Sequence, residues 1–281
     1  MLVSDTISVI DIHSHLVPGV DDGAKHVPGV LAAAERMADV GITSVVTTPH
    51  IRGSLTLDPP ALEHRLSAVS AAFDDAESAL AQHLPNFEYR RGHEVLIDIP
   101  EPDLSDPRIR MAGTSFVLLE WPRLAIPPGT PRVLRWIRDQ GYRPIVAHPE
   151  RYVGMSERLE LAEKWRDAGA YLQVNYGSFV GRYGAEAQSV AFRLLQLGIA
   201  DYLSSDFHGQ SSLKIYKREA WDLLLDRGGE EALRTLCRTN TGRLLEDLPP
   251  VPAVALPPMP GFMDRLRGAM KLRDRERKPS R

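Results

Sequence analysis

The sequence repeats one unit, in which a helical pattern ends at a glycine and an apolar segment follows at once. The four glycines at these junctions are Gly41, Gly141, Gly169 and Gly198. A glycine just past a helix accepts the left-handed backbone conformation with which helices commonly end. Strands that alternate with helices build a parallel sheet, because each parallel connection needs a crossover segment. The repeat therefore predicts an α/β fold.

Seven apolar segments are expected to form the strands of this sheet. They cover residues 7–12, 42–47, 87–94, 116–120, 144–148, 170–175 and 200–205, and helical patterns such as 27–40 and 59–83 fill most of the gaps. With seven parallel strands, closure into a TIM-like barrel is more economical than an open doubly wound sheet, which is the alternative. The chain has 281 residues, of which 43% are hydrophobic. This size allows one barrel domain as readily as two smaller domains.

Composition divides the chain near residue 248. Six of the twelve residues 249–260 are proline, which predicts an extended linker. Residues 262–281 carry eight Lys/Arg against three Asp/Glu, a net of +5, which leaves −8 for the rest of a chain whose total is −3. We therefore expect a barrel over residues 1–248, a linker over 249–260 and a basic tail over 261–281. The tail is either a helix that contacts an anionic membrane or an acidic partner, or a frayed terminus.

Several classes of protein are excluded by composition. The formal net charge is −3 and the pI is about 6.3, so the whole chain is no electrostatic nucleic-acid binder. No apolar stretch reaches the roughly 18 residues of a membrane span, and the amino terminus lacks the pattern of a signal peptide, so we expect a cytoplasmic protein. Cys237 is the single cysteine. A metal site in this chain therefore has to use nitrogen and oxygen ligands.

The stretch from Asp11 to His15 reads Asp-Ile-His-Ser-His and is followed by the acidic turn Asp21-Asp22-Gly23. Side chains two apart on a strand project to one side, so His13 and His15 can converge on one ion. Taken alone, the pair fits hydrogen-bonded packing as well as it fits chelation.

Further potential ligands recur where the expected strands end. Together with the first pair they are His13, His15, His50, Glu94, Glu120, His148, Asp206 and His208. In parallel barrels the carboxyl ends of the strands meet at one mouth, where functional residues gather. The recurrence therefore indicates a metal centre, whereas any one of these histidines alone is more often a core residue.

A different motif in this chain points to phosphoester chemistry by another route. Residues 237–243 match C-x5-R, the pattern of phosphatases that use a cysteine nucleophile. That chemistry needs a thiolate at the base of a loop between a strand and a helix. Because residues 230–236 have a helical pattern and no apolar strand leads into Cys237, we expect this cysteine to be structural.

The ordered motifs DIHSH with VDDG, TTPH, GHE, LLEW, AHPERY and SSDFH resemble the PHP (polymerase and histidinol phosphatase) superfamily. Within it, HSHLVPGVDDG and AHPERY resemble the bacterial tyrosine-protein phosphatases of capsular and exopolysaccharide operons. The resemblance covers about residues 9–248. It implies a distorted (β/α)7 barrel, a PHP-type catalytic domain, and hydrolysis of phosphotyrosine in proteins by a metal-activated hydroxide. The implied substrate is a tyrosine kinase of polysaccharide assembly.

The resemblance also implies three divalent metal ions, usually described as manganese, with iron or zinc as alternatives. By similarity, one ion is held by His13, His15, Glu94 and Asp206; Glu94 bridges to a second ion held by Glu120 and His148; and Asp22, His50 and His208 hold the third. Asp21 is the alternative to Asp22. Nitrogen and carboxylate ligands suit such ions.

Arginine side chains are candidates for substrate binding. Arg151, three residues past His148, can pair with phosphate oxygens through its guanidinium group and is the candidate catalytic residue. The family commonly has an arginine after the DxH segment; here Lys214 is the candidate replacement. Arg52 is a further candidate for anion binding. Trp121 and Tyr152 are candidates for an aromatic rim, although core packing is the expected role of Trp121.

Three other functions remain open at the level of sequence. A PHP phosphoesterase acting on a small molecule such as histidinol phosphate would use the same metals. Amidohydrolases that cleave C–N bonds also begin with an HxH pair, although the final Asp206-x-His208 pair and Glu94 argue against that class. A non-catalytic assembly module would act through its basic tail.

Overall fold

The computed structural model describes residues 8–257 and contains two parallel sheets. The smaller sheet has the order β1 (Val9–Ser14), β2 (Ile42–Thr47), β4 (Glu88–Arg91). The larger sheet has the order β3 (His50–Arg52), β5 (Glu94–Leu96), β6 (Phe116–Glu120), β7 (Arg143–Ala147), β8 (Tyr171–Asn175), β9 (Tyr202–Ser204). Every strand pair is parallel, as the helix-glycine-strand repeat predicts.

One of the expected strands is broken and another is followed by an unexpected short strand, and these two breaks in the chain divide the sheets. The expectation of one strand over residues 87–94 is wrong, since this segment is split into β4 and β5, and β3 was not expected. Pro49, between β2 and β3, has no N–H group to donate to a neighbouring strand. Gly92 lies between β4 and β5, where a Cβ atom would stand 3.1 Å from Val46 Cγ1 and 3.3 Å from the Met111 Cα atom. Proline and glycine thus explain the breaks.

The strands nevertheless follow the order of a barrel. β2 and β4 pair in one sheet while their continuations β3 and β5 pair in the other. The chain beyond β9 returns to β1 through hydrogen bonds from Asp206 N to His13 O and from His15 N to Phe207 O, both 2.9 Å. The expected distorted TIM-like (β/α)7 fold is confirmed, with two sheets in place of one continuous wall.

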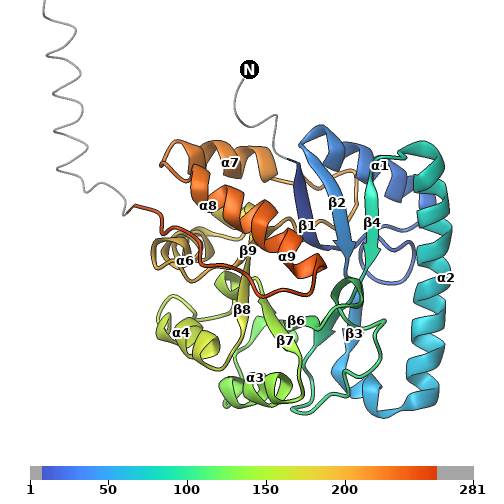
Figure 1. Ribbon diagram of the computed structural model, residues 1–281, viewed down its shortest axis with the longest axis horizontal. Helices are drawn as coiled ribbons and strands as arrows, with labels where there is room; N and C mark the ends of the chain where they lie inside the picture. The colour runs from blue at the N-terminus through green and yellow to red at the C-terminus, as the bar shows by residue number, and fades with distance from the viewer. Residues whose placement is uncertain (1–7, 258–281) are drawn as a thin grey trace, which may run out of the picture.

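Helices surround the strands, and the long helix α2 runs along one side of the molecule (Figure 1). The helices are α1 (Val27–Asp39), α2 (Pro59–His83), α3 (Thr130–Asp139), α4 (Glu160–Asp167), α5 (Tyr176–Phe179), α6 (Ala185–Gln196), α7 (Lys217–Leu225), α8 (Glu230–Arg234) and α9 (Asn240–Leu245). The glycines that were expected to end helices have positive φ angles, for example 82° at Gly41 and 96° at Gly169. They occupy the left-handed region, as the repeat requires.

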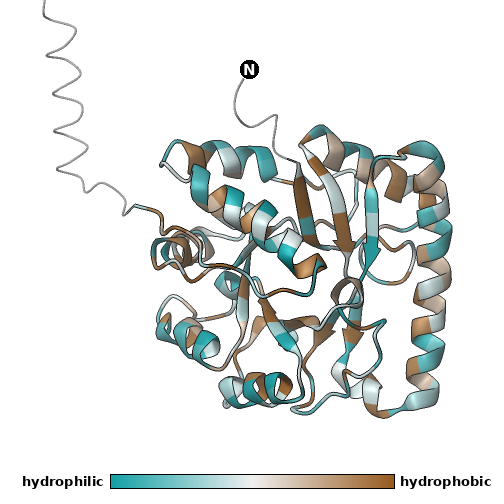
Figure 2. Cartoon of the chain, viewed as in Figure 1, coloured by the Kyte–Doolittle hydropathy of each residue, from teal (hydrophilic) through white to brown (hydrophobic). Residues whose placement is uncertain are grey.

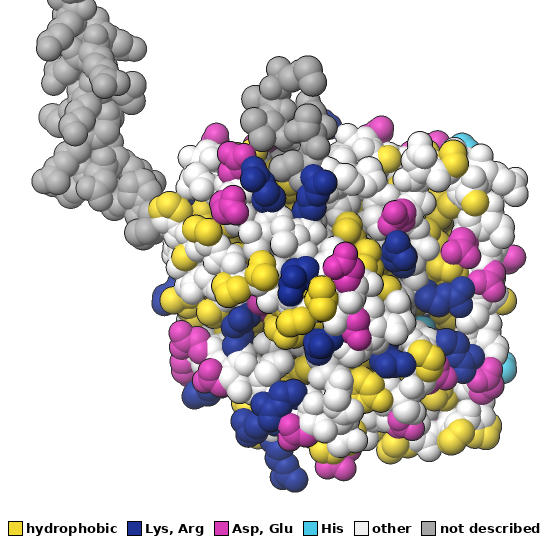
Figure 3. Space-filling view, viewed as in Figure 1, with side chains coloured by type: hydrophobic (Ala, Val, Ile, Leu, Met, Phe, Trp, Pro, Cys, Tyr) yellow, Lys and Arg dark blue, Asp and Glu magenta, His cyan; other side chains and the backbone are white. Residues whose placement is uncertain are grey.

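The core lies between the strands and these helices. Apolar residues concentrate on the strands, while the helices alternate apolar and polar positions (Figure 2). The largest fully buried side chains include Trp121, Trp165 and Trp221. On the face in Figure 3, basic and acidic side chains are interspersed, so this face carries no extended patch of one sign.

The proline-rich segment has no helix or strand in its described part, up to residue 257. It lies against the body of the protein: Leu256 is 5% exposed and its N–H donates to Leu195 O at 3.0 Å. The basic tail over 261–281 lies outside the described residues, and the division into barrel, linker and tail stays a prediction. Among residues 8–257, no helix has both the length and the apolar character needed to cross a bilayer.

Candidate metal centre

Nine expected ligands from distant parts of the chain come together at one end of the strands. They form four groups in which the ligand atoms lie within 4.8 Å of one another: His15, Asp22, His50, His208; His13, His15, Glu94; His13, His148, Asp206; and His50, Glu94, Glu120. Some of these ligands lie just after a strand, whereas two of them begin one: His50 is the first residue of β3 and Glu94 is the first residue of β5. These two residues are direct neighbours across the parallel pair β3 and β5.

Glu94 lies at the middle of the cluster and is 1% exposed. Its Oε2 atom is 3.3 Å from His13 Nε2 and 3.4 Å from His15 Nε2. The same oxygen is 3.1 Å from His50 Nδ1, and Oε1 is 3.2 Å from His148 Nε2. Burial opposes the charge of this carboxylate, but the surrounding histidines outweigh burial and hold its pKa well below the usual range.

Asp206 completes this side of the cluster. Its Oδ1 atom is 3.5 Å from both His13 Nε2 and His15 Nε2. Burial lowers the pKa of His13, but the charges of Glu94 and Asp206 outweigh it and raise the value to about 9. Burial also lowers the pKa of His148, and there it prevails: together with the charge of Arg151 it brings the pKa of this histidine down to about 4.

Glu120, the last residue of β6, is only 3.6 Å from His148 Nε2. Burial and the charge of Glu94 raise its pKa to about 7. Two close carboxylates that both carry charge repel each other unless a cation lies between them. The carboxylates of Glu94 and Glu120 together therefore have the electrostatic character of a cation site.

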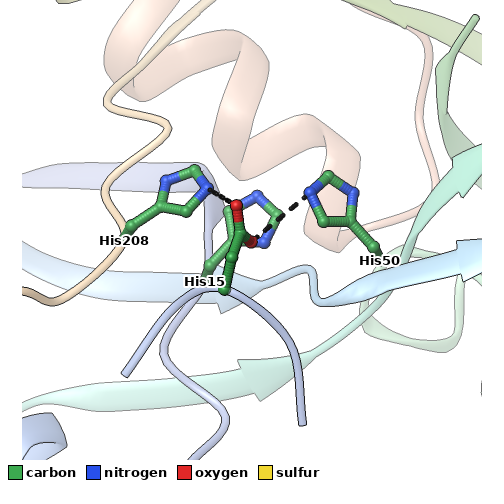
Figure 4. Close-up of side chains that lie close together, drawn as sticks. His15, His50 and His208 are labelled. Atoms are coloured by element: carbon green, nitrogen blue, oxygen red, sulfur yellow. Dashed lines mark ion pairs between the residues drawn. The ribbon is translucent and has the colours of Figure 1, made fainter. Parts of the chain in front are cut away.

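The two neighbouring aspartates of the acidic turn have different surroundings. Asp22 Oδ1 is 3.6 Å from His50 Nε2, and Asp22 Oδ2 is 3.4 Å from His208 Nε2. Figure 4 shows His15, His50 and His208 gathered in one place with their rings close together. Asp21 instead accepts hydrogen bonds from His15 Nδ1–H at 2.8 Å, Gly23 N–H at 2.9 Å and His50 N–H at 3.2 Å. Asp21 thus orients the histidines, while Asp22 is grouped with them.

The cluster is suited to divalent cations, because several of its buried polar atoms lack a hydrogen-bond partner. Among the described residues, His13 Nε2, His15 Nε2 and Glu94 Oε1 are buried without a hydrogen-bond partner. A buried polar atom with no partner is costly to the folded state. Imidazole nitrogens and carboxylate oxygens at these separations are a donor set that Mn²⁺, Fe or Zn²⁺ accepts. Bound cations would satisfy all three atoms.

Two ligand candidates have a backbone conformation that is unusual for residues other than glycine. His148 has a φ angle of 32°, and Asp206 has a φ angle of 52°. Such left-handed positions cost of order 1–3 kcal/mol and gather at functional sites. The chain turns sharply after β7 and β9 at these residues, which directs both side chains back into the cluster.

Sequence reasoning missed a group of buried polar residues that support the ligands. Gln173 Oε1 accepts a hydrogen bond from His13 Nδ1–H at 2.8 Å, and Asn175 Nδ2 donates to Asp206 Oδ2 at 2.9 Å. Asp11 accepts from His13 N–H at 3.1 Å and from Ser205 N–H at 2.8 Å. The available signal was the alternation of polar residues 173 and 175 at the end of an otherwise apolar strand.

Two cavities flank the cluster. The larger, of about 720 Å³, has His50, Glu120, Leu55, Leu96 and Arg52 among its lining residues. Arg52, a substrate-binding candidate, therefore belongs to this cavity. Four aliphatic side chains, Val20, Ile51, Leu55 and Leu96, stand among the polar residues of its walls, and they suit an apolar or aromatic group.

The smaller cavity, of about 310 Å³, is lined by Arg151, Lys214, Arg182 and Tyr183, together with Asp206 and His208. Arg151 Nη1 donates to Asp206 Oδ2 at 2.5 Å, and its guanidinium group lies 4.4 Å from the centre of the Tyr183 ring. Lys214 is 70% exposed and 3.9 Å from Glu219. Arg151 is thus held in place, whereas Lys214 is not.

Trp121 and Tyr152 do not form a rim: Trp121 packs in the core, as expected, and the expectation that Tyr152 lines the site is wrong. They are 1% and 2% exposed, and Trp121 N–H donates to the Tyr152 hydroxyl at 2.9 Å. Trp121 also stacks on Trp165 with ring centroids 5.5 Å apart. Tyr152 meets the Trp165 ring edge-on, with centroids 5.8 Å apart, so both side chains pack in the core. Tyr183 is the aromatic residue beside Arg151.

The structure places Cys237 away from any phosphate loop. It lies in the helical turn Thr235–Thr239 and is fully buried. The Tyr176 hydroxyl donates to its Sγ atom at 3.4 Å, and burial raises the pKa of the thiol to about 12. The thiol is protonated at neutral pH, so the C-x5-R pattern describes a structural cysteine, as expected.

Comparison with known proteins agrees with this geometry. The tyrosine-protein phosphatase YwqE of Bacillus subtilis is 28% identical over 229 residues, which cover 79% of this chain and 86% of YwqE. The tyrosine-protein phosphatase CpsB of Streptococcus pneumoniae is 24% identical over 247 residues, 85% of this chain and 99% of CpsB. One solved structure, described with the crystal structures of YwqE and of CpsB as unique metal-dependent tyrosine phosphatases, matches with a TM-score of 0.75 and 26% identity; the match covers 89% of this chain and 99% of that one.

A family model described as capsular polysaccharide synthesis, CpsB/CapC, matches residues 9–246. This range begins at β1 and ends after α9, so it includes every ligand candidate of the metal centre. The chain therefore belongs to the CpsB/CapC family of capsular polysaccharide synthesis.

Proposed function

We propose that this protein is a metal-dependent phosphatase that hydrolyses phosphotyrosine in proteins. The observation that carries the proposal is the buried cluster of histidines and carboxylates, whose unpartnered atoms face one another where the strands meet. Membership of the CpsB/CapC family supports it, as does the likeness to YwqE and CpsB, which are described as metal-dependent tyrosine phosphatases.

Three divalent cations, Mn²⁺ in first place and Fe or Zn²⁺ as alternatives, are proposed for the centre. The proposed ligands are His13, His15, Glu94 and Asp206 for the first ion, Glu94, Glu120 and His148 for the second, and Asp22, His50 and His208 for the third. Two of the four groups of neighbouring ligand atoms support this division, because one contains Asp22, His50 and His208 and another contains His13, His15 and Glu94. The second set is supported by the distances from His148 Nε2 to Glu94 Oε1, 3.2 Å, and to Glu120 Oε1, 3.6 Å. Such cations, when bound, lower the pKa of water and stabilise the negative charge of phosphoryl transfer.

Arg151 is proposed to bind and orient the phosphate group. One of its nitrogens is tied to Asp206, which leaves the rest of the guanidinium group facing the smaller cavity. A planar guanidinium group can bind two phosphate oxygens at once. Lys214 would add positive charge from a flexible and exposed position.

The larger cavity is proposed to hold the tyrosyl ring. It adjoins His50 and Glu120, so a ring in it would lie beside the phosphate position. Leu55 and Leu96 supply apolar contacts, and Arg52 can attract an acidic residue of the substrate near the cavity. We propose a tyrosine kinase of polysaccharide assembly as the substrate, because the family is described by capsular polysaccharide synthesis. Membrane contact through the basic tail 261–281 stays part of this proposal.

The test is turnover of a phosphotyrosine peptide and of histidinol phosphate by protein that is metal-stripped and then reloaded with Mn²⁺. Peptide turnover that is lost on stripping and regained with metal is the expected result. Preferred turnover of histidinol phosphate would establish the small-molecule alternative. Release of phosphate by stripped protein at the original rate would overturn the metal mechanism. A His148→Ala variant that folds and keeps full activity would also overturn it.

A further inference from the structure

Two amide side chains at the end of β8 lie against the metal centre without belonging to its proposed ligands. Gln173 and Asn175 are fully buried and project to the same side of the strand, because they are two residues apart. Gln173 contacts His13, Asn175 contacts Asp206, and the two amides are hydrogen bonded to each other at 2.8 Å. They connect two proposed ligands of the same ion.

The series of hydrogen bonds that links Asp206 to His13 through the two amides can have only one donor-to-acceptor direction. The Asp206 carboxylate can only accept, so the Asn175 amide has to turn its NH₂ group toward it, at 2.9 Å. The Asn175 oxygen then faces Gln173, which has to donate through its own NH₂ group. The Gln173 oxygen is left facing His13 Nδ1 at 2.8 Å. His13 therefore has to carry a proton on Nδ1.

We propose that Gln173 and Asn175 form a directional amide relay through which the Asp206 carboxylate sets the tautomer of His13, with Nδ1 protonated and Nε2 left free to bind the metal. This inference rests on the metal centre of the proposed function. Gln173 and Asn175 are positioning residues, since they act through His13 and Asp206.

The relay also selects which oxygen of Asp206 faces the cation. Oδ2 accepts from Asn175 Nδ2 at 2.9 Å and from Arg151 Nη1 at 2.5 Å. Oδ1 is left toward His13 Nε2 and His15 Nε2, each 3.5 Å away. Asn175 is itself fixed, because its backbone N–H donates to Glu150 Oε1 at 2.9 Å. This one series of hydrogen bonds thus orients the proposed ligand atoms His13 Nε2 and Asp206 Oδ1 and the phosphate-binding Arg151.

A simpler role for Gln173 is that of a local acceptor for His13, and one substitution separates the two roles. Gln173→Glu keeps the shape and still offers an oxygen to His13, but it turns a second oxygen toward Asn175. The relay is then reversed or broken. A carboxylate is the usual partner of a metal-bound histidine, so a local acceptor would work equally well or better as glutamate.

The test measures metal affinity without substrate, by competition of Zn²⁺ or Mn²⁺ with a chelator for the whole protein. We expect Gln173→Glu to weaken the site by about 10- to 100-fold, the range for outer partners of metal ligands. Asn175→Asp, which places an oxygen against Asp206, should act in the same direction. Gln188→Glu is the matched control: Gln188 also donates a side-chain hydrogen bond, to Phe179 O at 2.7 Å, but it lies outside the relay.

Equal or tighter metal binding by Gln173→Glu would overturn the relay, as would full affinity in Asn175→Asp. Where a variant fails to fold, the wild-type protein still gives an answer: ¹⁵N NMR of the Zn²⁺-loaded form should show His13 protonated on Nδ1, and a metal bound to Nδ1 would refute the proposal. Because these readouts need no substrate, absent phosphotyrosine turnover would remove the proposed function and leave the relay intact.

Discussion

The substitution of each aspartate in the acidic turn by asparagine gives a sharp test of the metal centre. Asp21 and Asp22 are adjacent, but their side chains are 5% and 66% exposed. Asp21 Oδ2 serves the N–H groups of His15 and His50, and Oδ1 serves Gly23. Asparagine offers a single acceptor oxygen, so at least one of these donors would be left facing an NH₂ group.

An unsatisfied buried donor costs about 1–3 kcal/mol. At about 2–4 °C per kcal/mol for a domain of this size, Asp21→Asn should lower the Tm of the metal-free protein by about 2–12 °C. Asp22 has no comparable hydrogen bonds to lose, so Asp22→Asn should leave the metal-free Tm unchanged. The two variants are matched in chemistry and differ only in what their side chains contact.

The stabilisation by added metal should instead be reduced in Asp22→Asn and not in Asp21→Asn. A cation at 100 times its Kd stabilises the folded state by about 2.7 kcal/mol, and a site weakened 100-fold would supply only about 0.4 kcal/mol. Asp22→Asn should therefore lose about 2.3 kcal/mol, most of the stabilisation that the third ion gives the wild type, while the other two proposed sites keep their contribution. The assay is thermal unfolding with and without added Mn²⁺. A normal Mn²⁺ response in Asp22→Asn, with the response lost in Asp21→Asn at an unchanged metal-free Tm, would make Asp21 the ligand.

Three other changes follow from the site. Arg151→Lys keeps the charge but loses the planar guanidinium group, so kcat/KM for a phosphotyrosine peptide should fall about 10- to 100-fold. Lys214→Ala should change kcat/KM less than about 3-fold. Equal effects of the two substitutions would contradict the distinction between the hydrogen-bonded Arg151 and the exposed Lys214. Cys237→Ser should keep full activity per folded molecule, and because the thiol pKa is about 12, iodoacetamide should modify native protein at pH 8 far more slowly than unfolded protein. Leu55→Glu should raise KM for the peptide and leave Mn²⁺ affinity unchanged; an unchanged KM would remove the larger cavity from substrate binding.

The local signals of the sequence predicted most of the fold. Helix-terminating glycines and apolar segments fixed the alternation of helices and parallel strands, since both depend on neighbours along the chain. The breaks at Pro49 and Gly92 were harder to predict, because a single proline or glycine is compatible with a strand edge or a bulge as well as with a change of sheet. Only the packing of Gly92 against Val46 and Met111 decides between these possibilities.

The ligand types were accessible from sequence because strand ends in a parallel fold share one edge. Their partners were not, since Gln173 and Asn175 are ordinary polar residues until His13 and Asp206 are placed beside them. Trp121 and Tyr152 illustrate the converse. They directly follow the site residues Glu120 and Arg151 in sequence, but both pack in the core against a third aromatic ring, Trp165. Contacts between distant residues decide both cases.

The short strands beyond the breaks bring part of the metal centre together. Pro49 follows β2 and Gly92 follows β4, and the chain resumes pairing at His50 and Glu94, which are neighbours across β3 and β5. The two strand pairs keep the same register, because Thr47 lies opposite Arg91 before the breaks and His50 lies opposite Glu94 after them. Residues that lie opposite each other in neighbouring strands project to the same side of a sheet, and His50 Nδ1 lies 3.1 Å from Glu94 Oε2. The register shared across the breaks therefore preserves the pairing that places a histidine in contact with the central carboxylate.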